Sequence, residues 1–177
     1  MNIIYRRLTK VDTKEYRAIR LECLKNYPLN FGSDFEEENE KPKLGYEEFI
    51  EQQSPDKFII GAFDNEKLIG ICGFFRELKR KNRHIGLIIQ MHVKPEYANK
   101  GIGFNLLRAM AEEAFKLEGI EQLTLGVVST NISANKIYEK LGFREYGVHK
   151  NHFKEGDTYF DQRFMVLYRE DFILSGL

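Results

Sequence analysis

The 177-residue sequence has few cysteines, no excess of charge of either sign and no long hydrophobic run. Its two cysteines, Cys23 and Cys72, form neither a CxxC pair nor a metal-binding spacing, so we expect no metal site. We expect free thiols in a reducing compartment, although a disulfide between them stays open. Lysine plus arginine and aspartate plus glutamate each number 27. A net charge of zero argues against general affinity for nucleic acid.

The same absences bear on location and domain organisation. No run reaches the roughly 20 apolar residues that cross a bilayer, and residues 1–8 lack the apolar region of a signal peptide. We therefore expect a cytoplasmic protein with no membrane partner. Hydrophobic residues at 42% and charged residues at 31% are ordinary for a globular protein. The length suits one core, so residues 1–177 are expected to form a single domain.

Periodic apolar residues predict a mixed α/β domain. Strands are expected at Ile3–Leu8, Phe58–Phe63, Leu68–Phe75, Ile85–Val93, Glu121–Val128, Arg144–His149 and Tyr159–Tyr168. A helix capped by Asp12 or Thr13 should run to about Tyr27. Its half-apolar face carries Tyr16, Ile19, Arg20, Cys23 and Leu24. With one more helix before residue 58 and two described below, the expected order is β-α-α-β-β-β-α-β-α-β-β.

A glycine-rich turn follows the strand at Ile85–Val93. Gly101 and Gly103 stand at the start of a helix expected over Phe104–Glu118 and ended by Gly119. Glycine lets the backbone turn tightly and approach a ligand, and a helix N-terminus presents unpaired N–H groups. Together they predict an anion site, most often for phosphate, although two glycines also serve plain packing.

Two commoner phosphate motifs do not fit this turn. A Rossmann fingerprint would need a third glycine where Leu106 stands, and would follow its strand immediately. A P-loop would need Gly-Lys-Ser/Thr, whereas Lys100 precedes its glycine and Ile102 follows it.

A second block of residues lies downstream. Asn131 is a good helix N-cap and Gly142 a good residue just after a helix, so a short capped helix is predicted between them. One stripe of this helix carries Asn131, Ala134, Asn135 and Tyr138. A stripe that faces a core is more usually wholly aliphatic, so this mixed stripe favours a ligand.

Together the two blocks resemble the GNAT superfamily of acetyl-CoA-dependent N-acetyltransferases. That family carries Arg/Gln-x-x-Gly-x-Gly/Ala at the start of a long helix, and Gly101 and Gly103 fit it. It also carries a later Asn-x-x-Ala-x-x-x-Tyr-x-x-x-Gly-Phe helix. The matching positions here are Asn131, Ala134, Tyr138, Gly142 and Phe143. Ala98 departs from the Arg/Gln position, so we expect the turn to act mainly through its backbone N–H groups.

The resemblance implies a fold and a cosubstrate. The fold is α/β: a GNAT-like mixed, largely antiparallel sheet with helices on both faces, whose strands splay apart beside the acyl-donor site. Backbone groups of one strand would pair with the pantetheine amides of acetyl-CoA, and the turn would hold its pyrophosphate. The implied binding residues are Met91, His92, Val93, Ala98, Asn99, Lys100, Gly101, Ile102, Gly103, Phe104, Asn131 and Asn135. Lys100 and Lys140 could neutralise phosphate charge or be ordinary surface lysines.

Tyr138 is the expected catalytic residue. When an amine attacks a thioester, the leaving thiolate needs a proton, and a phenol with an ordinary pKa of about 10 can supply it. The alternative is a core tyrosine whose hydroxyl bonds to the backbone. The general base stays open, because the strand Ile85–Val93 contains no carboxylate. His84, His92, water or a carboxylate from the N-terminal half are the candidates.

The acceptor is harder to read. Residues 30–41 are polar and acidic, and the resemblance implies that this region lines the acceptor side, where an acidic wall would attract a cationic amine. A solvated loop is the plain alternative. We expect a small-molecule amine such as an amino acid or polyamine. A protein or peptide N-acetyltransferase and a non-catalytic acyl-CoA-binding sensor are the alternatives. The final strands offer an edge for a homodimer.

Overall fold

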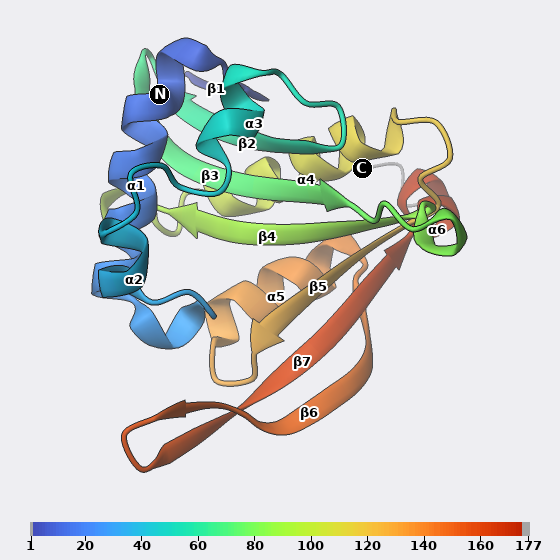
Figure 1. Ribbon diagram of the computed structural model, residues 1–177. Helices are drawn as coiled ribbons and strands as arrows, with labels where there is room; N and C mark the ends of the chain where they lie inside the picture. Colours follow the sequence, from blue (N-terminus) through green and yellow to red (C-terminus); the bar gives the residue numbers. More distant parts are fainter. Residues whose placement is uncertain (1, 175–177) are drawn as a thin grey trace.

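A single seven-stranded sheet forms the centre of the protein, and the computed structural model describes residues 2–174. The strands are β1 (Ile3–Arg7), β2 (Lys57–Asp64), β3 (Lys67–Arg76), β4 (Ile85–Val93), β5 (Gln122–Val128), β6 (Arg144–Glu155) and β7 (Thr158–Tyr168). Their order in the sheet is β1-β2-β3-β4-β5-β7-β6 (Figure 1). Only β4 and β5 pair in parallel. The expected largely antiparallel sheet is confirmed.

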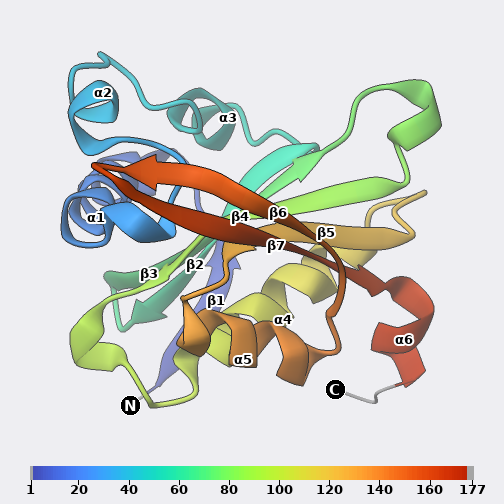
Figure 2. The same cartoon turned by 90° about the horizontal axis from the view of Figure 1, so that it is seen from below.

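Helices cover both faces of this sheet (Figure 2). On one face lie α1 (Thr13–Asn26), α2 (Phe35–Asn39) and α3 (Glu47–Glu51), and on the other lie α4 (Ile102–Phe115) and α5 (Ile132–Leu141). A last helix, α6 (Arg169–Leu174), follows β7. Because both faces are covered, β2 and β3 are almost continuously buried and apolar. Two hydrophobic clusters result, one around Leu106 and Met110 of α4 and one around Tyr16 and Ile19 of α1.

Several boundaries differ from those expected. The α4 helix spans Ile102–Phe115 rather than Phe104–Glu118, and Gly119 takes its left-handed conformation in the turn that follows. The β6 strand continues to Glu155 instead of ending at His149, across a register shift and a left-handed Asn151. The short helices α3 and α6 were not expected.

The β4 and β5 strands diverge after a short paired stretch (Figure 1). Residues Ile85–Ile88 pair with Gln122–Leu125, and the pairing stops there. Beyond it, β4 contains a bulge against β3 where Gln90 has a φ of 55°. The last residues of β4 therefore keep an edge towards β5 that no strand within residues 2–174 fills, as was expected beside an acyl-donor site.

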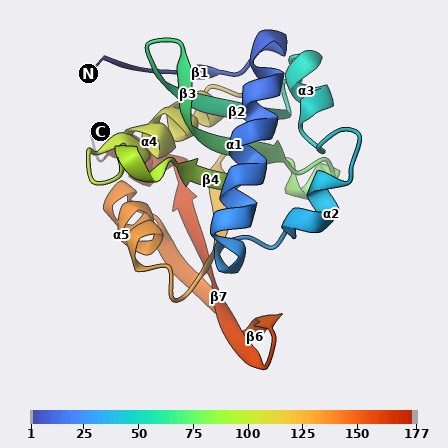
Figure 3. The same cartoon turned by 90° about the vertical axis from the view of Figure 1, so that its left-hand side faces the viewer.

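The β6–β7 hairpin reaches past the rest of the sheet (Figure 3). Its tip comes back against the segment after α1, because Phe153 of β6 packs on Gly32. A Cβ atom at Gly32 would lie 3.2 Å from Cε1 of Phe153. The hairpin thus closes one side of the opening between β4 and β5.

Candidate active site

A cleft of about 1260 Å³ opens where β4 and β5 separate. It is lined by the end of β4, the start of α4, one side of α5, residues 27–33 after α1, and the β6–β7 hairpin. Because these elements come from both faces, the cleft passes through the sheet. All of the expected site residues line it except Lys100 and Asn135.

The start of α4 presents bare backbone to this cleft. Asn99 and Gly101 have φ values of 59° and 75°, which turn the chain sharply into the helix. The first amide of the helix with a backbone partner is that of Asn105, which donates to Gly101 O at 3.1 Å. A Cβ atom at Gly101 would meet no protein atom within 4 Å. Free N–H groups at the positive end of a helix dipole form a cradle for an anion.

Lysines extend this positive region along α5. Lys136 and Lys140 lie one turn apart and both line the cleft, and Nζ of Lys140 stands 4.5 Å from the centroid of the Phe104 ring. Lys136 was not singled out in the sequence, although its i, i+4 spacing from Lys140 places both lysines on one side of the helix. Lys100 is engaged elsewhere, because its Nζ donates to Glu96 O at 2.9 Å.

Tyr138 is buried, with 6% of its surface exposed, and it lines the cleft. Its ring contacts Phe143 edge-on, with 6.0 Å between the centroids. Within residues 2–174 its hydroxyl makes no hydrogen bond, so it is not a core tyrosine tied to the backbone. Burial raises the pKa of this phenol. The hydroxyl therefore stays protonated at neutral pH.

The two amides of the predicted stripe have different environments. Asn131 lines the cleft and caps α5, accepting from the backbone N–H of Ala134 at 3.2 Å. Asn135 lies outside the lining, and its amide group donates to backbone carbonyls, nearest that of Asn131 at 2.8 Å. Its Oδ1 accepts from Arg163 Nη1 at 2.6 Å. These internal contacts occupy the polar atoms of Asn135, so its expected role in binding stays a prediction.

The candidate proton acceptors are only partly in the cleft. His84 lies outside the lining, whereas His92 is inside it and 9% exposed, with no partner for Nε2. Burial lowers the pKa of His92 to about 4, so the ring is neutral at pH 7. His152 of β6 also lines the cleft and was not foreseen.

The acidic segment does not form the expected wall. Its cleft-lining residues are Asn30, Phe31, Gly32 and Ser33, none of them acidic. Asp34 instead caps α2 by accepting from Glu37 N, and Glu38 pairs with Lys41 at 2.7 Å. No aspartate or glutamate of the described range lines the cleft.

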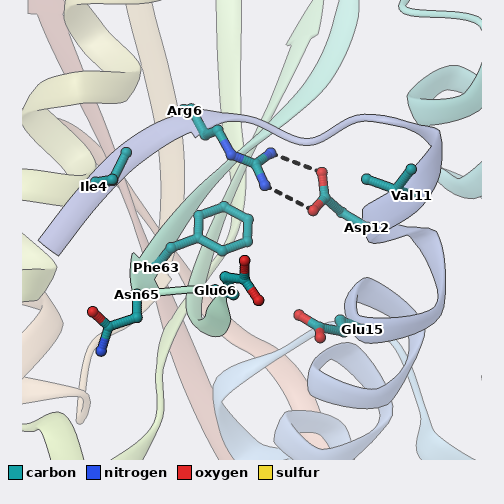
Figure 4. A pocket seen from close by; sticks show the side chains of 8 residues that line it. All are labelled: Ile4, Arg6, Val11, Asp12, Glu15, Phe63, Asn65 and Glu66. Atoms are coloured by element: carbon teal, nitrogen blue, oxygen red, sulfur yellow. Dashed lines mark hydrogen bonds and ion pairs between the residues drawn. The ribbon is translucent and has the colours of Figure 1, made fainter.

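A second, smaller pocket of about 410 Å³ lies at the edge formed by β1 (Figure 4). Its most prominent group is Arg6, whose two terminal nitrogens donate to Asp12 at 2.8 and 2.9 Å. The guanidinium also lies 3.9 Å from the Phe63 ring centroid. This pocket contains none of the expected site residues, and the charge of Arg6 is already paired with Asp12.

Residues 2–174 offer neither a cluster of metal ligands nor a membrane-spanning helix. Nowhere in this range do three or more His, Cys, Asp or Glu side chains gather so that they could hold a metal ion. Within the same range, no helix combines the length and apolar character needed to cross a membrane.

Comparison with known proteins identifies the fold and the family. The model of the acetyltransferase (GNAT) family matches residues 18–143. The chain is 36% identical over 108 residues to the spermidine N(1)-acetyltransferase of Thermoplasma acidophilum, covering 61% of this chain and 63% of that protein. It is 32% identical over 80 residues to the [ribosomal protein bS18]-alanine N-acetyltransferase of Escherichia coli K12, covering 45% and 53%. These matches thus span less than two thirds of either relative.

A solved structure agrees over nearly the whole chain. It is yncA, a putative acetyltransferase from Salmonella typhimurium with its cofactor acetyl-CoA. The TM-score is 0.78 at 19% identity, and the match covers 95% of this chain and 94% of that one. At this identity the likeness concerns the fold.

Proposed function

The chain belongs to the acetyltransferase (GNAT) family of acyltransferases that use acetyl-CoA, and from this premise we propose that it acetylates a primary amine of a small molecule. The observation that carries the proposal is the cleft between β4 and β5, with bare helix N–H groups at one end and an unbonded tyrosine hydroxyl inside it.

The residues of the cleft fit acetyl-CoA as the donor. The N–H groups of Ile102, Gly103 and Phe104, with Lys136 and Lys140 nearby, suit its phosphates. The open edge of β4 at residues 91–93 suits the amides of its pantetheine arm, which would lie along the strand as an added partner. Acetyl-CoA supplies the acetyl group as an activated thioester.

Tyr138 is proposed as the general acid. Its hydroxyl lines the cleft without a partner in the described chain and is protonated at neutral pH, so it has a proton to donate. It would donate that proton to the sulfur that leaves when the amine takes the acetyl group. The neutral His92, with a pKa of about 4, holds a proton too weakly to serve as the base at pH 7. We therefore assign the proton of the amine to solvent that enters the cleft.

A small acceptor fits better than a polypeptide. Phe153 packs against Gly32 at the hairpin tip and narrows the acceptor side of the cleft. A protein or peptide acceptor is the second candidate, favoured by the similarity to an enzyme named for acetylating a ribosomal protein.

Calorimetric titration of the purified protein with acetyl-CoA tests the proposal, with ATP and NADH as controls. We expect saturable binding of acetyl-CoA alone, followed by thiol release that depends on a free amine. Thiol release only with peptides would favour the protein-directed enzyme. Binding without release on any amine or peptide would leave a sensor, and no binding would reject the function altogether.

A further inference from the structure

Buried polar side chains separate into two groups in this protein. The described chain buries five of them: Asp12, Arg20, Glu47, His92 and Asn135. Asp12 and Glu47 form ion pairs with arginines, and Asn135 is bonded on both ends of its amide. In residues 2–174, Arg20 and His92 have no oxygen partner, and both line the cleft. An unpaired buried polar atom such as Nε2 of His92 is costly. Because the guanidinium of Arg20 has only a sulfur acceptor, it too can bind a ligand in the cleft.

Arg20 is the more informative of the two. It belongs to α1 and is 5% exposed, and within the described chain the only hydrogen bond of its guanidinium runs from Nη1 to Cys23 Sγ at 3.8 Å. Its guanidinium also lies 5.1 Å from the Phe31 ring centroid. Arg17, one turn earlier, instead pairs with Glu47 at 3.1 Å.

The contrast with Arg6 shows what Arg20 lacks. Arg6, although half exposed, has both terminal nitrogens on the carboxylate of Asp12 (Figure 4). A guanidinium is always charged and its fork of N–H donors matches a carboxylate, with two parallel bonds. Arg20 presents the same fork to the cleft without that partner.

The positive charge of the cleft disfavours cationic acceptors. Its charged lining residues are Arg20, Lys136 and Lys140, and in the described chain none is acidic. Lys136 and Lys140 are assigned to the phosphates of the donor, so Arg20 is the charged group left to meet the acceptor. A polyamine would bring further positive charge against Arg20, at a cost in binding free energy. An acceptor that carries an anionic group would be attracted instead.

We propose that the acceptor amine also bears a carboxylate, which Arg20 binds on the α1 face of the cleft beside Nε2 of His92. This inference rests on the proposed function and narrows its substrate class to amino-acid-like amines. The amino group would point towards the donor face and Tyr138, while the carboxylate points towards α1. In an N-terminal residue of a peptide, an amide stands where a free amino acid has its α-carboxylate.

Binding to the protein saturated with coenzyme A tests Arg20 independently of turnover. The probes are N-acetyl-L-amino acids and the matching N-acetyl-L-amino acid amides, which differ only in the carboxylate. Calorimetry should show the acids binding roughly 10- to 100-fold more tightly than the amides, the span of a hydrogen bond to a charged group. N-acetylaspartate amide and N-acetylglutamate amide distinguish a side-chain carboxylate from an α-carboxylate.

Three variants locate the effect. Arg20→Met keeps an apolar side chain against Phe31 and should abolish the preference for the acids, and Arg20→Lys should restore part of it by returning the charge. Lys14→Met removes an exposed charge from the same helix and should change nothing. Thermal unfolding reports whether each variant is folded. If Arg20→Met is unfolded, the comparison of the wild type with Arg20→Lys tests the role of Arg20 alone.

The outcomes distinguish this inference from the proposed function. Equal binding of acids and amides, or a preference that survives in Arg20→Met, would overturn the role of Arg20 even if amines are acetylated. Selective binding of the acids that depends on Arg20 supports it even if no amine releases thiol, in which case only the proposed function fails.

Discussion

Tyr138 and Asn135 lie one turn apart on α5, but their polar atoms differ in hydrogen bonding. The amide of Asn135 is held by three backbone carbonyls and Arg163, whereas the hydroxyl of Tyr138 makes no hydrogen bond in the described chain and lines the cleft. A buried group without a partner is available for chemistry, and a fully bonded one stabilises the fold. The two residues therefore call for different experiments.

Replacement of Tyr138 by phenylalanine should remove the proton donor and leave the ring in place. We expect kcat to fall by roughly 10²- to 10⁴-fold, the usual contribution of acid–base assistance, with acetyl-CoA affinity almost unchanged. Steady-state kinetics and calorimetry on the same samples measure both quantities. An unchanged kcat would remove Tyr138 from the mechanism.

His92 should make stability depend on pH. Burial lowers its pKa from 6.5 to about 4, with Arg20 and Lys94 also lowering it and Glu22 and Glu96 opposing them. Between these values the unfolded chain binds a proton that the folded protein does not, so the free energy of unfolding falls as pH drops from 6.5 towards 4. The full loss is about 3 kcal/mol and levels off below pH 4. Urea unfolding of wild type and His92→Gln at pH 7 and 4.5 measures it, and an equal loss in both would contradict this origin.

Single residues could be assigned from sequence where their role is local. The turn at Gly101, the Asn131 cap and the expected place of Tyr138 all depend on neighbours within one helix or loop. The missing partner of Arg20 and the burial of His92 depend on contacts between α1, β4 and the hairpin, which are far apart in the chain. The sequence therefore placed Arg20 on the half-apolar face of α1, but it could not show which group, if any, pairs with the charge of Arg20.

At the scale of elements, α5 is held by Asn135 as well as by its apolar face. Asn135→Ala should leave three carbonyls and Arg163 Nη1 without this partner, at a cost of about 1–3 kcal/mol. For a protein of this size the melting temperature should fall by about 2–4 °C per kcal/mol. Calorimetric melting measures it.

Ser133→Ala is the matched control, because Ser133 is exposed and makes one hydrogen bond, to Asn131 Oδ1. It should shift the melting temperature little. Equal shifts in the two variants would show that the hydrogen bonds of Asn135 add no more stability than that of Ser133.

Elements with strong periodicity were predicted within a few residues, and weak ones were not. Strands such as β2 and β4 carry long apolar runs, whereas α3 has only five residues, too few for a periodic pattern. The outer half of β6 is mostly exposed and polar, and pairing with β7 holds it in place. The formation of α3 and the length of β6 therefore depend on tertiary contacts, which a local sequence pattern does not show.

At the scale of the whole molecule, acetyl-CoA should stabilise the folded state. At 100 times its dissociation constant a ligand adds about 2.7 kcal/mol, which at this chain length raises the melting temperature by roughly 5–10 °C. ATP and NADH should produce no comparable shift. A thermal-shift assay measures the change, and its absence would count against a donor site in the cleft.

Gly101→Ala tests where that stabilisation arises. Its Cβ atom would strain a backbone with φ of 75° and enter the anion cradle, so the shift should shrink. Gly45→Ala is the control, because a Cβ atom there also meets nothing within 4 Å and its φ is ordinary.

The divergence of β4 from β5 leaves an opening through the sheet, so the cleft can be reached from both faces. In the proposed reaction the donor would enter from the side of α4 and α5, and the acceptor from the side of α1. Each product can then leave by the side from which its precursor came, without waiting for the other. Free coenzyme A should therefore inhibit competitively against acetyl-CoA and non-competitively against the amine, and double-reciprocal plots for the two substrates should intersect rather than run parallel.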